Sequence, residues 1–368
     1  MDENSTQIIR EMITLLGIVV TTVGGIVAAS KSNLLKSRIS VALITLAMLA
    51  MIIILGIITW RISRGVGVIP DLSKTPVVVT PSTQQPFQGI GQVRMVLASK
   101  PDGSDYYAIY LALINGTTIQ QLQSLTHDLA DNFDPSWSPN ANSIVFLQEI
   151  DGYDQIYIMN ADGRESRRIT YYAGNDGTPA WSPDGKRIAF QRTVGHGLDI
   201  YIMNVDGTNM VNLTQSNLAD NAPVLNQYPT WSPDGSQIAF QSNRDGQMAV
   251  FILDVSSKIV MKRLTDPALL DAAGPAWSPD GFTIAFTGMV GNQRDIFLVP
   301  SDGSSSAHPC VSTPQAEWSP NWSSDGRFLA VHVGEGKHQI AILDCEKRIV
   351  ESLIINNADN LSPAWAPK

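Results

Sequence analysis

The stretch Thr178–Thr214, TPAWSPDGKRIAFQRTVGHGLDIYIMNVDGTNMVNLT, decides the fold of this chain, because five other segments repeat its plan. It contains two apolar runs, Ile188–Phe190 and Ile200–Met203, with Asp-Gly pairs at Asp184–Gly185 and Asp206–Gly207. Asp-Gly flanked by apolar runs is a strong short-range signal for a β-hairpin. The stretch therefore predicts four short strands joined by hairpin turns, which is typical of one blade of a β-propeller.

A tryptophan marks each copy of this unit, and its spacing gives the repeat length. Successive copies lie 44, 50, 46, 45 and 43 residues apart, at Trp137, Trp181, Trp231, Trp277, Trp322 and Trp365. A nearly fixed period in this range indicates a repeated supersecondary unit. Because the neighbours of these tryptophans are apolar, we expect them to pack between blades rather than to stack against sugar rings.

The tryptophan is followed in most copies by a Ser-Pro-Asp-Gly turn, in which proline presets φ and glycine accepts a positive φ. Each turn leads into three apolar residues, Ile144–Phe146, Ile188–Phe190, Ile238–Phe240, Ile284–Phe286 and Phe328–Ala330. Consecutive apolar residues indicate strands that are buried on both faces, as blades packed face against face require. The fourth strands are more polar, for example Arg164–Thr170, and are predicted on the outer rim.

The first copy lacks the strand that carries the tryptophan. Val93–Ala98, Tyr106–Ala112 and Thr118–Thr126 supply three strands, and the missing one is found at the other end of the chain, in Ser362–Pro367. A carboxyl-terminal strand placed innermost in the first blade would close the ring without a free edge. The predicted fold class is therefore all-β, a six-bladed β-propeller closed by its C-terminal strand and preceded by two transmembrane α-helices.

The repeat resembles that of the TolB-type β-propeller family. The similarity is carried by PAWSPDGKRIAF, YPTWSPDGSQIAF and GPAWSPDGFTIAF, followed by DIYIMNVDG and RLT, and it covers residues 91–368. The resemblance implies a binding face like the one that TolB, a periplasmic protein, offers its lipoprotein partner. Similar propellers also serve as peptidase gating domains and polysaccharide lyases. TolB carries an α/β domain before its propeller, whereas two apolar segments occupy that place here.

Those two apolar segments are Met12–Ala29, with 18 uncharged residues, and Ile39–Trp60, with 22. Each is long enough to cross a bilayer core. The residues before the first segment are net acidic, and a cleaved signal peptide has a basic start, so we expect two membrane helices instead. The predicted organisation is a tail at 1–11, two transmembrane helices with a short basic loop at 12–61, a Pro-rich linker at 62–90 and the propeller at 91–368.

The charge pattern predicts which side of the membrane the propeller occupies. The loop between the apolar segments holds Lys31, Lys36 and Arg38. By the positive-inside rule, this loop is cytoplasmic and both termini lie outside. We therefore expect membrane localisation with an extracytoplasmic propeller, periplasmic or at the cell surface.

The propeller itself is acidic. Residues 1–90 hold 7 of the 25 basic and 4 of the 34 acidic side chains, which leaves 18 and 30, a net charge of −12, for residues 91–368. A surface with this charge repels phosphate backbones, so nucleic acid is excluded as a partner.

Acidic and amide residues recur just before the tryptophan strands, in loops that meet at one end of the central channel. We predict that they form a binding surface for a protein or peptide, composed of Asp131, Asn132, Asp176, Asp220, Asn221, Asp271, Glu317 and Asp359. A ring of such groups would attract basic or amide-rich segments. The competing interpretation is that each side chain caps its own loop. Gln215–Tyr228 is longer than its counterparts, and we expect partner-specific contacts there.

No catalytic motif accompanies this surface. The sequence contains no Gly-x-Ser-x-Gly elbow and no phosphate-binding Gly-rich loop. His332 and His338 flank Glu335, but two histidines and one glutamate on a hairpin usually face solvent, so we predict no metal ion and no cofactor. Cys310 and Cys345 fall on different predicted blades, and we expect no disulfide between them.

The predicted function is that of a membrane-anchored, non-catalytic module that binds a protein or peptide at the channel mouth. Two alternatives stay open. The chain could be a polysaccharide-active or cation-dependent enzyme that uses His332, His338 and the channel acids. It could also be a sensor in which the propeller binds a ligand and the helices transmit that signal across the membrane.

Overall fold

The structure of the 368-residue chain is a computed structural model. It describes residues 92–127, 130–215, 223–266, 269–311, 313–334, 336–353, 355 and 358–368. The predicted membrane helices and the Pro-rich linker lie outside the described residues, as do Asp220, Asn221 and Glu335. Within the described part of the chain, no helix is long and apolar enough to span a membrane.

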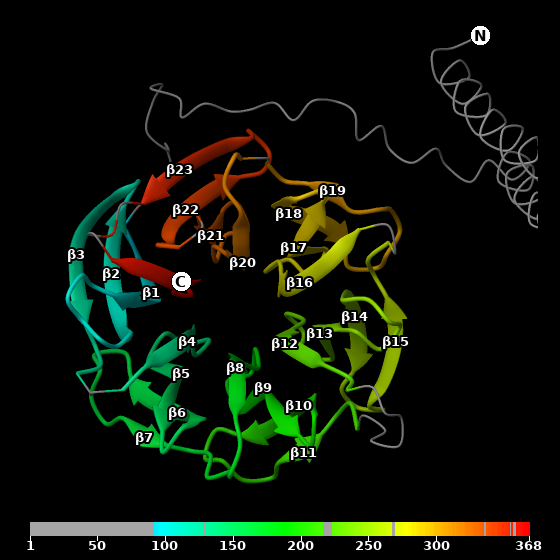
Figure 1. Cartoon of the computed structure of the whole chain (residues 1–368), viewed down its shortest axis with the longest axis horizontal. Coiled ribbons are helices and arrows are strands. Elements are labelled where there is room, and N and C mark those ends of the chain that lie inside the picture. Colours follow the sequence, from blue (N-terminus) through cyan, green and yellow to red (C-terminus); the bar gives the residue numbers. More distant parts are fainter. Residues whose placement is uncertain are drawn as a thin grey trace, which may run out of the picture. The chain divides into compact units, whose positions relative to one another are not determined.

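Six four-stranded antiparallel sheets surround a central channel (Figure 1). From the channel outward, blade 1 consists of β24 (Asp359–Trp365), β1 (Gln92–Lys100), β2 (Ala108–Asn115) and β3 (Thr118–Ser124). Blade 2 consists of β4 (Asn132–Trp137), β5 (Ser143–Ile150), β6 (Tyr153–Asn160) and β7 (Arg167–Arg168). Blade 3 consists of β8 (Asp176–Trp181), β9 (Arg187–Val194), β10 (Gly197–Asn204) and β11 (Val211–Asn212).

Blade 4 consists of β12 (Asn226–Trp231), β13 (Gln237–Ser242), β14 (Ala249–Asp254) and β15 (Ile259–Arg263). Blade 5 consists of β16 (Leu270–Trp277), β17 (Thr283–Val290), β18 (Gln293–Pro300) and β19 (His308–Pro309). Blade 6 consists of β20 (Glu317–Trp322), β21 (Leu329–Val333), β22 (Gln339–Asp344) and β23 (Ile349–Leu353). The outer strands β7, β11 and β19 are only two residues long, so the predicted strand Arg164–Thr170 is shortened to Arg167–Arg168.

The carboxyl-terminal strand closes the ring, as predicted. β24 pairs antiparallel with β1 through Met95↔Trp365 and Ser99↔Asn360, and Figure 1 shows it as the red strand beside the cyan strands of blade 1. Trp365 is buried in a cluster that joins blade 1 to blade 6 and includes Ile342. Six blades and closure by the C-terminal strand are therefore confirmed.

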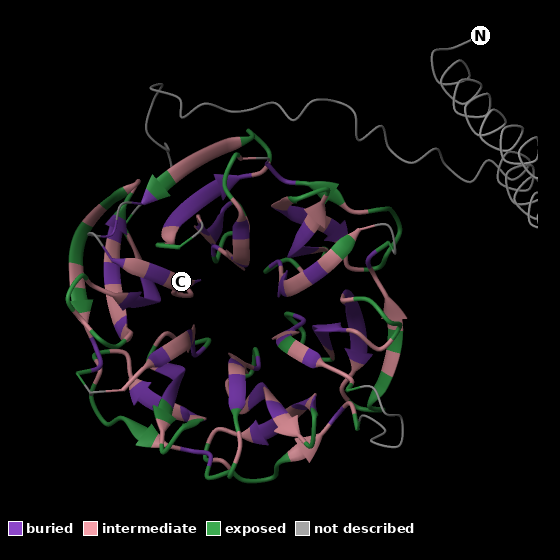
Figure 2. Ribbon diagram, viewed as in Figure 1, coloured by how far each residue is buried: buried purple, intermediate pink, exposed green. Residues whose placement is uncertain are grey.

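The core lies between neighbouring blades, and Figure 2 shows the buried residues gathered along their middle strands. The phenylalanine of the apolar triplet is fully buried in four blades, as in Phe190 and Phe240. Trp231 packs against Ile200 of blade 3 and Ile238 of its own blade 4. Its Nε1–H donates a hydrogen bond of 3.1 Å to the carbonyl of Ala180 in blade 3. The prediction that this tryptophan packs between blades is confirmed.

Each innermost strand contains a register shift just before a proline. The residue preceding that proline has a positive φ, between 44° and 55°, at Asp134, Thr178, Tyr228, Gly274, Ser319 and Ser362. Five of these six are not glycine, although a positive φ is uncommon for other residues. A β-bulge redirects a side chain, and here all six positions line the central channel.

Cys310 and Cys345 form a disulfide, so the expectation of unpaired cysteines was wrong. The two residues do belong to different blades, since Cys310 follows β19 of blade 5 and Cys345 follows β22 of blade 6. Face-to-face packing of these blades brings the two Cα atoms within 4.8 Å, a distance that a disulfide can span. Both cysteines lie in one apolar cluster with Leu343.

Reduction of this disulfide is expected to lower the free energy of unfolding by about 3–4 kcal/mol, because the bridge closes a loop of chain in the unfolded state. The sequence separation of the two cysteines is 35 residues. Guanidinium unfolding with and without reductant measures the effect. The double variant Cys310→Ala, Cys345→Ala serves as the control and should not respond to reductant. Equal midpoints for the wild type under both conditions would contradict the prediction.

Candidate functional site

All six innermost strands begin at the same end of the channel. In each blade, the start of the innermost strand pairs with the end of the second strand, as in Asn132↔Gln148 and Asp176↔Arg192. The loops that enter the innermost strands therefore surround one opening together with the loops between the second and third strands. We call this surface the mouth.

Three of the predicted binding residues are buried at the first position of an innermost strand, namely Asn132, Asp176 and Glu317. Asn132 donates to the carbonyls of Tyr107 in blade 1 and Ala130. Asp176 accepts two hydrogen bonds from Arg192, of 2.7 and 2.8 Å. A buried carboxylate paired in this way does not offer a free negative charge to a partner.

Glu317 is 0% exposed at the interface of blades 5 and 6. Its Oε2 accepts the backbone N–H of Ile296 at 3.1 Å, and Oε1 has no hydrogen-bond partner among the described residues. Burial raises the pKa of Glu317 to about 8, although hydrogen bonds from the Thr313 side chain and the Ile296 backbone lower it. This side chain is therefore mainly protonated at neutral pH.

Asp131 and Asp359 accept backbone N–H groups of the preceding blade. Oδ1 of Asp131 accepts from Tyr107, and Oδ1 of Asp359 accepts from His338, both at 2.8 Å. Asp359 also accepts hydrogen bonds from the Tyr107 hydroxyl and from Nδ1 of His338. These contacts hold each loop against the neighbouring blade, so both carboxylates have a structural role at the mouth.

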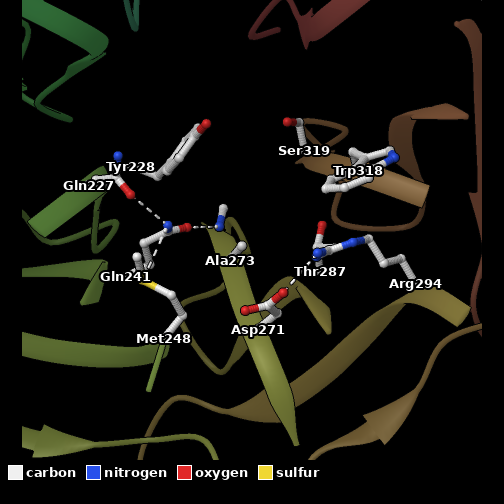
Figure 3. A pocket seen from close by; sticks show the side chains of 11 residues that line it. Gln227, Tyr228, Gln241, Met248, Asp271, Ala273, Thr287, Arg294, Trp318 and Ser319 are labelled. Carbon is white, nitrogen blue, oxygen red and sulfur yellow. Dashed lines mark hydrogen bonds and ion pairs between the residues drawn. The ribbon is translucent and has the colours of Figure 1, made fainter. Parts of the chain in front are cut away.

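Asp271 differs from the others, because its side chain is 47% exposed. Its Oδ2 accepts a hydrogen bond of 2.8 Å from Nη2 of Arg294 in the same blade. The two side chains line a cavity of about 270 Å³, which we call the Asp271 pocket (Figure 3). The pocket is formed by Gln227, Tyr228, Gln241, Met248, Asp271, Ala273, Gly274, Thr287, Arg294, Trp318 and Ser319.

Two further carboxylates face cavities at the mouth, and neither was predicted from the sequence. Asp134 lines the channel, a cavity of about 250 Å³, and accepts a hydrogen bond of 2.7 Å from the Ser362 hydroxyl. Asp154 lines an adjoining cavity of about 460 Å³ that also includes Asp134. Burial raises the pKa of both carboxyls, and the charge of Glu149 adds to the effect at Asp154. The signal for Asp134 was its position three residues before Trp137, and no such signal marks Asp154.

Tyr228 lies where these cavities meet, since it lines the channel, the Asp271 pocket and the cavity that contains Asp154. Tyr228 is 38% exposed, and its backbone has a φ of 53°. Its N–H donates to Oε1 of Gln191 in blade 3, which holds the backbone in place. Tyr228 ends the long loop in which we predicted partner-specific contacts, and residues 216–222 of that loop lie outside the described residues.

His332 and His338 lie side by side, with ring centroids 5.2 Å apart. Burial lowers the pKa of His332 to about 3, so the ring is neutral at physiological pH. In the described ranges, no group of three or more His, Cys, Asp and Glu side chains has the arrangement of a metal site. Glu335, the third member of the cluster considered from the sequence, is not among those residues.

Comparison with known proteins extends these observations. The family model of the TolB beta propeller domain matches residues 87–224, 172–255 and 217–368. No curated protein matches the chain. The structure of TolB from Acinetobacter baumannii is similar, with a TM-score of 0.65 and 23% identity over 75% of this chain and 67% of that one.

Two further solved structures show the same fold at low identity. A putative TolB from Agrobacterium tumefaciens has a TM-score of 0.56 and 21% identity, over 72% of this chain and 90% of that one. A puromycin-hydrolysing peptidase of Mycobacterium tuberculosis has a TM-score of 0.51 and 14% identity, over 70% of this chain and 44% of that one. Because the family model covers well over half of the sequence, the chain belongs to the TolB-type β-propeller family.

Proposed function

We propose that this chain is a membrane-anchored propeller that binds a protein or peptide segment at the mouth and catalyses no reaction. The observation that carries the proposal is the position of Tyr228, where three cavities meet. Tyrosine is enriched among the residues that contribute most to binding at protein interfaces, where the partner covers it. Tyr228 shares the positive φ of the equivalent residue in the other five blades, and all six residues line the channel.

The size of the cavities favours a peptide segment over a compact small molecule. The three cavities measure about 250, 270 and 460 Å³, at or below the lower part of the range of roughly 300–1,000 Å³ for drug-sized ligands. They adjoin one another, because the channel shares Tyr228 and Ser319 with the Asp271 pocket and shares Asp134 with the third cavity. An extended segment could place one side chain in each of them.

The charge of the mouth favours a basic or amide-rich segment. Asp134 and Asp154 line one cavity together, and Asp131 contributes a further negative charge to the environment of Asp154. Converging carboxylates attract cationic and hydrogen-bond-donating groups. Of the residues predicted from the sequence, we propose that Asp131, Asp220, Asn221 and Asp359 contribute to binding through this field and Asp271 through its own pocket, while Asn132, Asp176 and Glu317 support the loops.

The disulfide and the amino-terminal sequence support an extracytoplasmic location. Disulfides persist in oxidising compartments and are rare in the cytosol, and Cys310 and Cys345 form one here. The uncharged segments Met12–Ala29 and Ile39–Trp60 would anchor the chain in the membrane. Similarity to the peptidase covers 44% of that chain and reflects the shared fold alone.

Replacing Tyr228 by asparagine is expected to weaken peptide binding at least tenfold without lowering the melting temperature by more than a few degrees. Asparagine tolerates the positive φ at this position, so the change removes the aromatic anchor and keeps the backbone. Peptides are selected from a random display library on the full-length protein, and their affinities for the two forms are measured by fluorescence anisotropy.

The matched control is Phe282→Asn. Phe282 is 75% exposed in the turn between β16 and β17, at the end of the blade away from the mouth. This change should leave peptide affinity unaltered. If the selected peptides bind wild type and Tyr228→Asn equally well, the mouth is not the binding surface.

A further inference from the structure

The Asp271 pocket presents a hydrogen-bond donor and an acceptor side by side. One N–H of Arg294 is bonded to Oδ2 of Asp271 at 2.8 Å, and among the described residues this is the only bond of either charged group. A guanidinium has five N–H donors, and a carboxylate accepts through two oxygens. N–H donors of Arg294 and the second carboxylate oxygen of Asp271 therefore remain available to a ligand.

Aromatic side chains flank this pair. The guanidinium carbon of Arg294 lies 4.4 Å from the centre of the Trp318 ring, so the indole fixes the guanidinium plane. Figure 3 shows Tyr228 and Trp318 on opposite sides of the pocket, with Asp271 below and between them and Arg294 below Trp318. A group that enters the pocket beside Tyr228 meets both charged side chains.

A buried hydroxyl adds an independent sign that the pocket is built for a ligand. Thr287 is 1% exposed and lines the pocket, and its Oγ1 has no hydrogen-bond partner among the described residues. Leaving such a group unpaired is unfavourable, and a polar ligand would satisfy it. By contrast, the amide of Gln241 is already engaged, since it donates to Gln227 and accepts from Gly274.

We propose that the Asp271 pocket receives a primary carboxamide, the side chain of a glutamine or asparagine in the bound segment. The inference rests on the proposed function and names the chemistry of one anchor. A carboxamide carries an acceptor oxygen and a donor NH₂ on one planar edge. The oxygen accepts from Arg294 and the NH₂ donates to Asp271, beside the ring of Tyr228.

The charges argue against an ionic side chain in this pocket. Asp271 and Arg294 neutralise each other at 2.8 Å. A glutamate would be attracted by Arg294 but repelled by the carboxylate of Asp271. A lysine would be attracted by Asp271 but repelled by Arg294. An unpaired like charge in a partly desolvated site is strongly unfavourable, whereas a carboxamide satisfies both groups without adding charge.

The test uses a peptide selected on the full-length protein whose binding is sensitive to Tyr228→Asn. The peptide residue assigned to the Asp271 pocket is varied among glutamine, glutamate, lysine and methionine. Dissociation constants are measured by fluorescence anisotropy. For the wild-type protein we expect glutamine to bind at least tenfold more tightly than glutamate, its near isostere, or lysine. The methionine peptide, whose side chain has a similar length but no carboxamide, should also bind more weakly than the glutamine peptide.

Removing one member of the pair should invert this preference. In Asp271→Ala, Arg294 is no longer neutralised, so the glutamate peptide should bind more tightly than the glutamine peptide. In Arg294→Met, Asp271 remains alone, and the lysine peptide should bind most tightly. Asp162→Ala and Arg164→Met are the controls, because this pair is solvent-exposed on the hairpin between β6 and β7 and should not alter the order.

Two outcomes overturn the inference, and they are distinguishable. If the peptides depend on Tyr228 but their order is unchanged in Asp271→Ala and Arg294→Met, the carboxamide site is wrong and the proposed function stands. If no selected peptide depends on Tyr228, the proposed function fails and the inference fails with it.

Discussion

Between pH 4.5 and pH 8, the wild-type protein is expected to lose roughly 3–5 kcal/mol of stability relative to the Glu317→Gln variant. Glu317 is 0% exposed, and burial raises its pKa to about 8 in the folded protein from an ordinary value of 4.5. Across this pH range the unfolded chain has released the proton while the folded protein still holds it. The folded state therefore binds more protons, and stability falls as pH rises, until the buried carboxyl ionises near pH 8.

The glutamine side chain still accepts the N–H of Ile296 but cannot ionise. The stability of the Glu317→Gln variant should therefore lack this component of the pH dependence. Urea unfolding at half-unit steps between pH 4.5 and 8.5 measures the difference, which cancels the contributions of all other groups. Glu346→Gln is the control, because Glu346 is exposed in the turn between β22 and β23. A constant difference between wild type and Glu317→Gln would show that the carboxyl ionises normally in the folded state.

Replacing Trp365 by alanine is expected to destabilise the propeller by about 3–5 kcal/mol, the range for removing a large aromatic side chain from a core. Trp365 is buried among residues of blades 1 and 6 and lies in the strand that closes the ring. Its backbone N–H also donates to Oδ1 of Asn321 in blade 6, a contact that the substitution leaves in place. The loss therefore measures side-chain packing at the closure.

Guanidinium unfolding of Trp365→Ala beside Ile259→Ala makes the comparison direct. Ile259 is 60% exposed on the outer strand β15, and its truncation should cost less than about 0.5 kcal/mol. A similar small cost for both variants would mean that the carboxyl-terminal strand contributes little to the stability of the ring.

The blade count and the closure could be predicted from the sequence because both are local patterns repeated along it. The tryptophan period gives the number of units, and the absence of a tryptophan strand in the first unit points to Ser362–Pro367. The outer strands were less predictable. They pair on one edge only, so few contacts fix their length, and Arg164–Thr170 is reduced to the two residues of β7.

The site was harder to predict, because the direction of a side chain depends on the bulge in each innermost strand. Glu317 comes two residues before the bulge and is buried between blades, whereas Asp134 occupies the bulge and faces the channel. A polar residue near a loop looks the same in the sequence in both cases. The disulfide was missed for a related reason, since the distance between Cys310 and Cys345 depends on how adjacent blades stack.

The way in which the ring is closed determines where unfolding would begin under mechanical tension. Within blade 1, hairpins join β1 to β2 and β2 to β3, whereas β24 is held to β1 by a ladder of hydrogen bonds without a covalent connection. Blade 6 is bound covalently to blade 5 on its other side. A pull on the chain that precedes Gln92 acts on β1, which a hairpin joins to β2 but only hydrogen bonds join to β24. Tension transmitted from the amino-terminal side would therefore load the β1–β24 ladder within blade 1, beginning at Met95↔Trp365.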